Sequence, residues 1–495
     1  MYYIGYDLGS SSIKAALVDV DSGKSAGVTQ YPDQEMAILS VKPGWAEQDP
    51  DLWWNYICDV TKKLLLKTKV SSDKIKGIGI SYQMHGLVIV DKNYKVLRPS
   101  IIWCDSRAVE IGNKTYKGVG EEKCVNNLLN SPGNFTLSKL RWVKENEPGL
   151  FDQIYKFLLP GDYIALKLTG AATTTISGLS EGIMWDFKQN QPAVWLFDYM
   201  GISSDLIPTI VPTFSNQGNL TKESATEIGL MPGIPLLYRA GDQPNNALSL
   251  NVFQPGEIAA TGGTSGVVYA ITDSTETGES LRINNFAHVN YTKELPRIGK
   301  LLNINGAGIQ YSWMKKNIAL STDSYEDMNA LASKVPVGSD GLRIIPFGNG
   351  AERMLNNQNK GASVFNLNFN RHKKEHLYRA GLEGIAFSFV YGIEILKNDG
   401  VDVSVIRAGN DNLFRSELFS NTIATLVNTE INIVDTTGAV GAGRAAGVSN
   451  GDFDSLRAIF SVDDKVKTFR PLIEKQAFIE AYNLWKNDLE NSYNN

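Results

Sequence analysis

Residues 4–19, IGYDLGSSSIKAALVD, and residues 257–269, EIAATGGTSGVVY, decide the fold of this chain. Each stretch has two runs of strand-forming residues joined by a turn of glycine, serine or threonine, which predicts a β-hairpin with a polar turn. The second hairpin lies just past the middle of the chain and resembles the first in design. Two domains that each open with such a hairpin would explain the repeat, and two unrelated glycine-rich hairpins are the alternative.

The length of the chain, 495 residues, predicts more than one domain, since a domain usually has about 100–200 residues. We expect an N-terminal domain over 1–248 and a C-terminal domain over 249–495, with the boundary between Asn245 and Pro255. Strand and helix patterns alternate in both halves, which predicts an α/β architecture.

The C-terminal half ends in a readable strand–turn–helix unit. Residues 403–408 are strand-like, and 413–427 have the apolar spacing of an amphipathic helix that Asn412 would cap. Glycines and alanines alternate over 438–447, which predicts a second helix packed closely beside that one, because small residues allow a close approach.

Composition excludes several classes of protein. Lys and Arg total 48 and Asp and Glu total 53, so the net charge is −5, and neither nucleic acid nor an anionic membrane is an expected partner. No apolar run approaches the roughly 18 residues of a membrane span. Three cysteines without close spacing fit a reducing compartment, and the strand-like start fits no signal peptide. We expect a cytoplasmic protein.

The turn of the first hairpin is a candidate phosphate site. Backbone N–H groups and hydroxyls in such a turn form a concavity that binds anions, here at Gly9, Ser10, Ser11 and Ser12. Asp7 would repel a bare phosphate, so its useful role is to hold Mg²⁺ through water, since that ion prefers oxygen ligands and keeps several waters. An ordinary hairpin turn is the alternative.

The turn of the second hairpin is denser in glycine and hydroxyl groups than a connection requires, which favours a second phosphate cradle. Its candidate ligands are Gly262, Gly263, Thr264 and Ser265. Two such cradles imply a nucleotide held between two domains. The later polar turn would then flank the adenosine through Gly409, Asn410 and Asn412, unless it is a simple strand-to-helix connection.

Asp242 is the candidate catalytic base. It follows the buried-strand pattern of 236–240 and Gly241, a position at which active-site groups of open α/β sheets usually lie. Phosphoryl transfer needs an aspartate that accepts the proton of the attacking hydroxyl. A helix N-cap is the alternative role for Asp242. Gln243, the next residue, is a candidate substrate contact.

Two polar clusters interrupt apolar strands and are candidates for binding a sugar, which polar side chains beside an aromatic face recognise. The first contains Gln83, Met84 and His85, and the second contains Trp103, Asp105 and Arg107. A structural histidine, and a local ion pair or helix cap formed by Asp105 and Arg107, are the alternatives.

These motifs, in this order, resemble the FGGY family of carbohydrate kinases over nearly the whole chain. DLGSSSIK at 7–14 is similar to the family's D-x-G-T-S-x-x-(K/R), and TGGTSG at 261–266 resembles its second phosphate loop. Asp242 matches the catalytic aspartate of the family. The segments most similar to its xylulose-phosphorylating members are WAEQDP at 45–50, QMHG at 83–86, WCDSR at 103–107 and LPGDYI at 159–164.

The resemblance implies two ribonuclease H-like, actin-like ATPase domains that close over ligands in a cleft. It implies transfer of the γ-phosphate of MgATP to a ketopentose, D-xylulose first, with Met84 and His85 on the sugar, Asp242 as general base, and Mg²⁺ at Asp7 through water and at Asp242. Ribulose, fuculose, gluconate or glycerol as acceptor, or an actin-like ATPase without a sugar, are the alternatives. A homodimer is the usual expectation for such an enzyme.

Three departures from the family pattern stand out. Ser10 replaces a threonine and keeps its hydroxyl. AGNDN at 408–412 replaces a loop richer in glycine, which predicts different nucleotide contacts there. GAERM at 350–354 carries one residue more than the usual motif.

Overall fold

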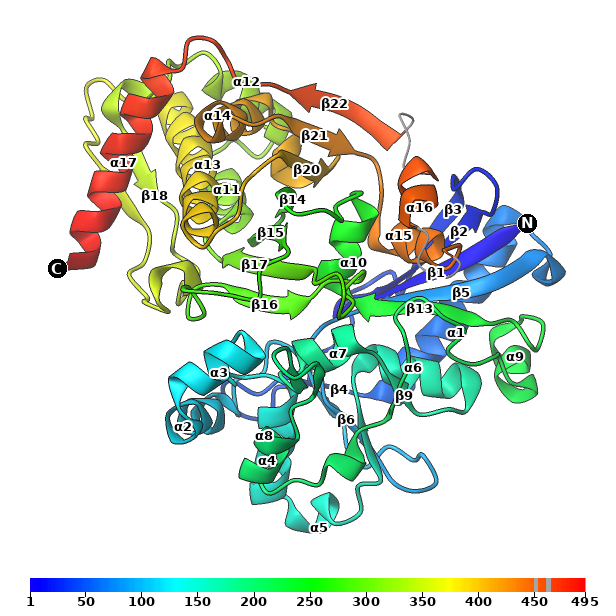
Figure 1. The fold of residues 1–495 in the computed structure, drawn as a ribbon. Helices are drawn as coiled ribbons and strands as arrows, with labels where there is room; N and C mark the ends of the chain where they lie inside the picture. Colours follow the sequence, from blue (N-terminus) through cyan, green and yellow to red (C-terminus); the bar gives the residue numbers. More distant parts are fainter. Residues whose placement is uncertain (449–452, 460–463, 495) are drawn as a thin grey trace.

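The computed structural model describes residues 1–448, 453–459 and 464–494, and contains two large β-sheets (Figure 1). The first sheet has five strands in the order β13-β5-β1-β2-β3. Their bounds are β1 Tyr2–Leu8, β2 Ile13–Asp19, β3 Ser25–Tyr31, β5 Ile75–Tyr82 and β13 Leu236–Gly241. β1, β5 and β13 run parallel, whereas β2 and β3 extend the sheet antiparallel.

The second sheet has seven strands in the order β16-β17-β15-β14-β20-β21-β22. Their bounds are β14 Glu257–Gly262, β15 Gly266–Thr272, β16 Asn284–Ala287, β17 Ile298–Ile304, β20 Val405–Gly409, β21 Ile431–Val434 and β22 Lys465–Phe469. β14, β20 and β21 run parallel, and β15 and β17 follow antiparallel.

The two sheets share one topology. The order β13-β5-β1-β2-β3 of the first corresponds, strand for strand and with the same directions, to β21-β20-β14-β15-β17 of the second. Both predicted hairpins are present: β1 pairs with β2 as far as Leu8 and Ile13, and β14 pairs with β15 as far as Gly262 and Gly266. The repeat predicted from the two hairpins therefore extends to the surrounding strands.

Two short helices lie between the sheets (Figure 1). Helix α10, Asp242–Ser249, follows β13 of the first sheet and contacts β14 and β15 of the second. Helix α15, Gly438–Ala445, follows β21 of the second sheet and contacts β1, β2 and β5 of the first. The helices also touch each other, since a Cβ placed on Gly441 would lie 1.7 Å from the Ser249 hydroxyl oxygen.

The predicted helix over the glycines of 438–447 thus forms, but its partner differs from the prediction. It packs on the first sheet rather than beside the helix at 417–427. A Cβ on Gly5 of β1 would lie 1.9 Å from the carbonyl oxygen of Ala439, and one on Gly79 of β5 would lie 2.0 Å from that of Ala442. Backbone contacts this close require glycine in the strands as well as small residues in the helix.

Helices cover the remaining sheet surfaces. α1, Pro50–Thr68, buries Trp53, Ile57, Val60 and Leu64 against the first sheet and begins at the N-cap Asp49. α13, Lys374–Asn398, α14, Glu417–Val427, and α17, Gln476–Asn494, belong to the second sheet's layer. The prediction that Asn412 caps α14 is wrong. A 3-10 turn over Asn412–Arg415 precedes the helix, and the Ser416 side chain accepts the capping hydrogen bond from Phe419 N.

The segment between β5 and β13 contains short helices and strands, and part of it lies below the second sheet (Figure 1). Its apolar side chains pack with Tyr269, Phe286 and Leu301 of that sheet, so the insertion contacts both halves of the molecule. Its helices are α2 Val109–Val119, α3 Glu121–Leu128, α4 Thr136–Asn146, α5 Pro148–Phe151, α6 Pro160–Thr169, α7 Ile176–Glu181, α8 Val194–Tyr199 and α9 Lys222–Ile228. Within the described ranges no helix is long and apolar enough to cross a bilayer.

Candidate active site

The parallel strands of the first sheet bring the two predicted carboxylates to one edge. Asp7 on β1 pairs in register with Ser81 on β5, which pairs with Ala240 on β13, two residues before Asp242. The Ser81 hydroxyl donates a 2.9 Å hydrogen bond to Asp7 Oδ1. The carboxyl ends of parallel strands are where open α/β sheets bind their ligands.

The two carboxylates interact electrostatically. Burial and, to a smaller extent, the negative charge of Asp7 together raise the pKa of Asp242 to about 7, although hydrogen bonds from the backbone and side chain of Gln243 oppose the shift. Burial also raises the pKa of Asp7, which the Ser81 hydrogen bond and the Lys14 ammonium oppose. Asp242 therefore titrates near neutral pH, as a general base requires.

The start of α15 closes over Asp7. A Cβ placed on Gly438 would lie 2.6 Å from Asp7 Oδ2, and Asn245 Nδ2 donates a 3.0 Å hydrogen bond to the Gly438 carbonyl. In the described part of the chain no three His, Cys, Asp or Glu side chains gather as a metal cage. Two neighbouring carboxylates supply only hard oxygen donors, a set that fits Mg²⁺ with several of its waters retained.

The first predicted phosphate turn has unused donors. Gly9 N donates to Ser12 O at 3.1 Å, but in the described residues the N–H groups of Ser10 and Ser11 donate to no other group of the chain. Lys14 lies near this turn and near the later polar turn, since its charge opposes the raised pKa of both Asp7 and Asp411. Free N–H groups beside an ammonium are suited to a phosphate chain.

The second predicted phosphate turn has the same property. The carbonyl oxygens of Gly263 and Thr264 accept hydrogen bonds from Gly308 N and Ile309 N, at 3.1 and 3.0 Å. These bonds hold the turn from behind. In the described residues the N–H groups of 263–265 donate to no group of the chain, and Thr264 and Ser265 are exposed.

A cavity of about 340 Å³ adjoins this second turn. Gly262, Gly263 and Thr264 line one side, and Asn412 lines another, so the structure brings these four predicted residues together. Gly409 ends β20, and Asn410 N donates to the Val434 carbonyl at 2.9 Å; neither residue lines the cavity. Other lining residues are Tyr311 and Ser312 of α11, Gly308–Asn317, and Tyr325, Glu326 and Asn329 of α12, Tyr325–Ala332.

Helix α10 joins the candidate base to the second hairpin. Asn246, one turn after Asp242, donates from Nδ2 to the Thr261 hydroxyl at 3.1 Å. Thr261 directly precedes the glycines of the second turn. Asp242, the candidate base, and the predicted phosphate turn of the second sheet are therefore linked through a single helical turn.

His85 is held as a neutral hydrogen-bond acceptor. Its backbone has a positive φ of 62°, and its ring lies against Phe135 and Phe286, with centroids 4.9 and 5.4 Å away. Nδ1 lies 2.9 Å from the Glu181 carbonyl oxygen, so Nδ1 carries the proton and Nε2 keeps its lone pair. Burial and, to a smaller extent, the Lys139 charge together lower the pKa of His85 to about 3.

Met84 and Glu181 lie directly against the strand end that carries the base. A Cβ on Gly241 would lie 2.5 Å from Glu181 Oε2 and 2.6 Å from Met84 Cγ. Burial raises the pKa of Glu181 well above its usual range, and the charge of Asp242 raises it further. Glu181 has no motif around it in the sequence; only the close packing of α7 on β13 identifies it.

Lys139 is a second residue that the sequence did not reveal. It is fully buried in α4, and its ammonium donates to the carbonyl oxygens of His85, at 2.8 Å, and of Ile102, at 3.0 Å. The first carbonyl belongs to one predicted sugar-binding segment, and the second directly precedes the other, which begins at Trp103. Burial lowers the pKa of Lys139 to about 7, and the charge of Asp105 opposes that shift. Lys139 therefore ties the two segments together.

The second polar cluster divides into an exposed and a buried part. The Trp103 side chain is prominent at the surface, with 52% exposure, and its Nε1 donates to the Ser10 hydroxyl at 3.3 Å. Asp105 and Arg107 are buried and face each other, with Arg107 Nη2 2.7 Å from Asp105 Oδ2. Their pairing is the alternative role considered above, and sugar binding by these two residues stays a prediction.

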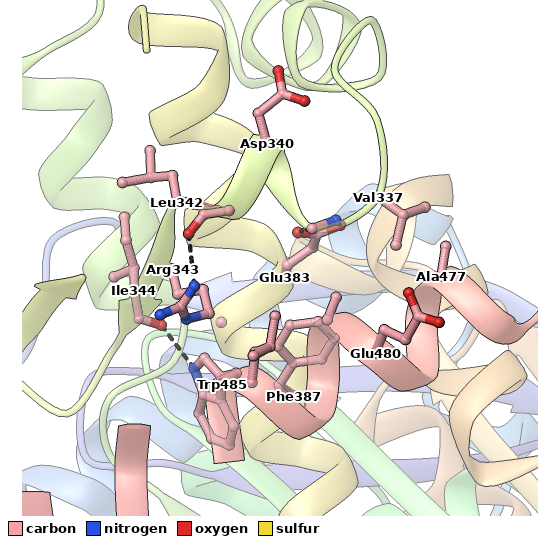
Figure 2. A pocket seen from close by; sticks show the side chains of 16 residues that line it. Val337, Asp340, Leu342, Arg343, Ile344, Glu383, Phe387, Ala477, Glu480 and Trp485 are labelled. Atoms are coloured by element: carbon pink, nitrogen blue, oxygen red, sulfur yellow. Dashed lines mark hydrogen bonds between the residues drawn. The ribbon is translucent and has the colours of Figure 1, made fainter. Parts of the chain in front are cut away.

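Another cavity, of about 190 Å³, lies far from these groups, between β18, Arg343–Ile345, α13 and α17. Figure 2 shows Glu383, Phe387 and Trp485 among its lining side chains, and Trp485 Nε1 donates to the Ile344 carbonyl at 2.9 Å. None of the predicted site residues is among the described residues that line it.

Comparison with known proteins agrees with this geometry. A family model described as the N-terminal domain of the FGGY family of carbohydrate kinases matches residues 2–249, and the model of its C-terminal domain matches 258–449. A xylulose kinase of Bacillus subtilis is 28% identical over 92% of this chain and 89% of its own. A xylulose kinase of Escherichia coli is also 28% identical, over 92% and 91%.

A crystal structure of xylulose kinase from Rhodospirillum rubrum has the same fold. Its TM-score is 0.88 over 100% of both chains, at 24% identity. The two matched sheets are the paired domains of the actin-like ATPase fold, as predicted. The motifs, the fold and both family models agree, and the chain belongs to the FGGY family of carbohydrate kinases.

Proposed function

We propose that this enzyme transfers the γ-phosphoryl group of ATP to the terminal hydroxyl of D-xylulose. The relatives named above carry the proposal for the acceptor. The observation that carries the proposal for the chemistry is the pair Asp7 and Asp242, two carboxylates at one sheet edge, linked through α10 to a turn with unused N–H donors.

The reaction is an in-line displacement at the γ-phosphorus. A new bond joins the sugar oxygen to phosphorus, the bond to the β,γ-bridging oxygen breaks, and ADP leaves with that electron pair. Asp242 orients the sugar hydroxyl and accepts its proton. N–H groups of Ser10, Ser11 and the second turn orient the phosphates and stabilise their charge.

Mg²⁺ would be held by Asp7 through water, with Asp242 as the second candidate ligand, and it would supply charge neutralisation on the phosphates. On the acceptor side, His85 Nε2 accepts a hydrogen bond from a sugar hydroxyl, because Nδ1 already donates to Glu181 O. Met84 packs on the carbon chain of the sugar beside Gly241.

We assign nucleotide phosphates to the second turn and the adenosine to the adjoining cavity, beside Asn412. We also infer a domain division at 248/249, in the last turn of α10 and ahead of the second hairpin. A cytoplasmic location and a homodimer stay predictions.

A panel of acceptors tests the proposal. ADP release by the purified enzyme is measured with D-xylulose, L-xylulose, D-ribulose, L-fuculose, gluconate and glycerol, each at several concentrations. We expect the highest kcat/KM with D-xylulose and little ATP hydrolysis without sugar. A higher kcat/KM with another acceptor would replace D-xylulose, and ATP hydrolysis that no sugar stimulates would remove the kinase reaction.

A further inference from the structure

The side-chain amide of Gln48 connects the two halves of the candidate active site. Gln48 lies in the short strand β4, Glu47–Gln48, and is only 3% exposed. Nε2 donates to the Ser10 carbonyl at 2.7 Å and points toward the Ala37 carbonyl at 3.5 Å. Oε1 accepts from Trp53 Nε1 and from Gln83 Nε2, both at 3.2 Å. Every hydrogen-bonding position of this amide is therefore occupied.

The two residues that Gln48 connects, Ser10 and Gln83, lie in the predicted binding sites of different substrates. Ser10 lies in the first predicted phosphate turn, where the N–H groups of Ser10 and Ser11 have no partner in the described residues. Gln83 directly precedes Met84 and His85 in the sugar segment. It is buried, and its Oε1 has no hydrogen-bond partner in the part of the chain that the structure describes. An unpaired buried oxygen needs a donor, and a sugar hydroxyl supplies one.

A second contact runs in parallel with the amide. Trp103 Nε1 donates to the Ser10 hydroxyl at 3.3 Å, while Gln48 holds the Ser10 carbonyl. Trp103 follows Ile102, whose carbonyl Lys139 binds together with that of His85. Gln48 and Trp103, which both contact or adjoin the predicted sugar-binding residues, therefore each donate a hydrogen bond to Ser10 of the first phosphate turn.

We propose that Gln48 is a positioning residue that couples acceptor binding to the first phosphate turn, so that sugar and nucleotide bind cooperatively. The inference rests on the proposed function. Oε1 and Nε2 are atoms of one planar amide, so a sugar that fixes Gln83 also fixes Gln48 and, through it, the Ser10 carbonyl. A turn ordered in this way presents its N–H groups to the phosphates with less loss of conformational entropy on binding.

Linkage makes the coupling measurable from either side, because sugar must strengthen nucleotide binding by the factor by which nucleotide strengthens sugar binding. Isothermal titration calorimetry gives the Kd of ADP with Mg²⁺, with and without saturating D-xylulose. For the wild-type enzyme we expect a ratio between about 5 and 150, the usual range for such coupling.

Gln48→Met and Gln83→Met remove the connection at its middle and at its sugar end. Methionine has nearly the same length and shape as glutamine and forms no hydrogen bond to Ser10. We expect the ratio to fall at least threefold in each variant. Since both residues act through one chain of hydrogen bonds, the double variant should lose no more than either single variant.

Gln217→Met is the matched control. Gln217 is also 3% exposed, and its Nε2 donates to the carbonyls of Pro212 and Thr213, at 3.1 and 3.0 Å, away from the site. This variant should lose thermal stability to a similar extent and keep the wild-type ratio. A merely structural role for Gln48 would therefore lower the melting temperature and leave the ratio unchanged.

A wild-type ratio retained in Gln48→Met would overturn the inference, and so would a wild-type enzyme that binds both ligands without coupling. If Gln48→Met does not fold, the ratio measured for Gln83→Met takes its place, and a wild-type ratio in that variant would overturn the inference. An enzyme that phosphorylates no sugar in the acceptor panel contradicts the proposed function itself, and the inference falls with it.

Discussion

Asp7 at the end of β1 and Asp242 just after β13 lie on either side of β5, and the charge of Asp7 helps burial to raise the pKa of Asp242 to about 7. A carboxylate with such a pKa is a better proton acceptor than a solvent-exposed aspartate. The same pair would hold a divalent cation that relieves their repulsion. In the proposed reaction, one sheet edge would therefore supply both the proton acceptor and the carboxylates that hold the metal.

Replacing Asp242 with asparagine should abolish proton acceptance while preserving most of the local shape. We expect Asp242→Asn to lower kcat at least ~10²-fold with little change in the sugar KM, because general-base catalysis contributes about 10²–10⁴-fold. Steady-state kinetics with D-xylulose measure both constants. Asp73→Asn, at an exposed aspartate distant from the sheet edge, should behave like the wild type. Turnover close to normal in Asp242→Asn would exclude Asp242 as the base.

The raised pKa of Asp242 predicts a pH dependence of activity. The ionised form is the base, so kcat/KM for the sugar should rise with pH through an inflection near 7. The residual activity of Asp242→Asn should lack that inflection. Because bound Mg²⁺ would relieve the repulsion from Asp7, the inflection at saturating Mg²⁺ and ATP should lie below 7, so the profile is measured from about pH 4.5 to about pH 8.5. A wild-type profile that is flat over this whole range would contradict the assignment.

The same shift predicts a pH dependence of stability. Because folding raises the pKa of Asp242 above its unfolded value of about 3.9, the contribution of this group is fully present below that value and is lost as pH rises through about 7. The melting temperature of Asp242→Asn relative to wild type should therefore increase between about pH 3 and pH 8, about one unit beyond each of the two pKa values. A difference independent of pH would indicate an ordinary pKa in the folded enzyme.

A methyl group at residue 438 should displace Asp7. In Gly438→Ala the new Cβ would meet Asp7 Oδ2 at 2.6 Å, so the carboxylate must move away from its bond to Ser81. We expect the KM for MgATP to rise by about tenfold, as for the loss of one charge-assisted hydrogen bond. Gly149→Ala is the control, since a Cβ there meets no atom within 4 Å. An unchanged KM for MgATP in Gly438→Ala would argue against a metal-binding role for Asp7.

Removing the Lys139 ammonium should loosen both sugar-binding segments. Lys139→Met loses two hydrogen bonds from a charged donor, so we expect the sugar KM to increase about tenfold and the KM for ATP to change little. Lys300→Met is the matched control, because Lys300 in β17 of the second sheet is also buried but pairs with Asp399 at the end of α13. It should lose stability without a change in the sugar KM. Equal effects on both KM values in Lys139→Met would indicate a general loss of structure.

The local parts of the fold could be predicted from the sequence. Strand-forming runs around a polar turn identify both hairpins, and the apolar spacing of 53–66 identifies α1. Asp242 could be singled out because it directly follows a buried strand, but a helix N-cap fits the same pattern, and its role as the base stays a prediction. The cap of α14 was misplaced from Ser416 to Asn412, because both residue types cap helices and the intervening 3-10 turn leaves no periodic signal.

The tertiary connections could not be predicted in this way. Lys139 lies 54 residues from His85 and 37 from Ile102, and an isolated lysine in a helix usually faces solvent. Gln48 is 38 residues from Ser10 and 35 from Gln83. The glycines of α15 predict that another element packs closely against this helix, but they do not indicate that the element is the first sheet.

The position of α15 limits how this enzyme can be divided or recombined. Helix α15 fills a face of the first sheet at which Gly5 and Gly79 leave no room for a methyl group. An isolated fragment of 1–248 would expose that face to water, and the remainder would carry a helix without its partner. Chimeras that exchange one half between homologous kinases must therefore transfer residues 438–448 together with the N-terminal segment.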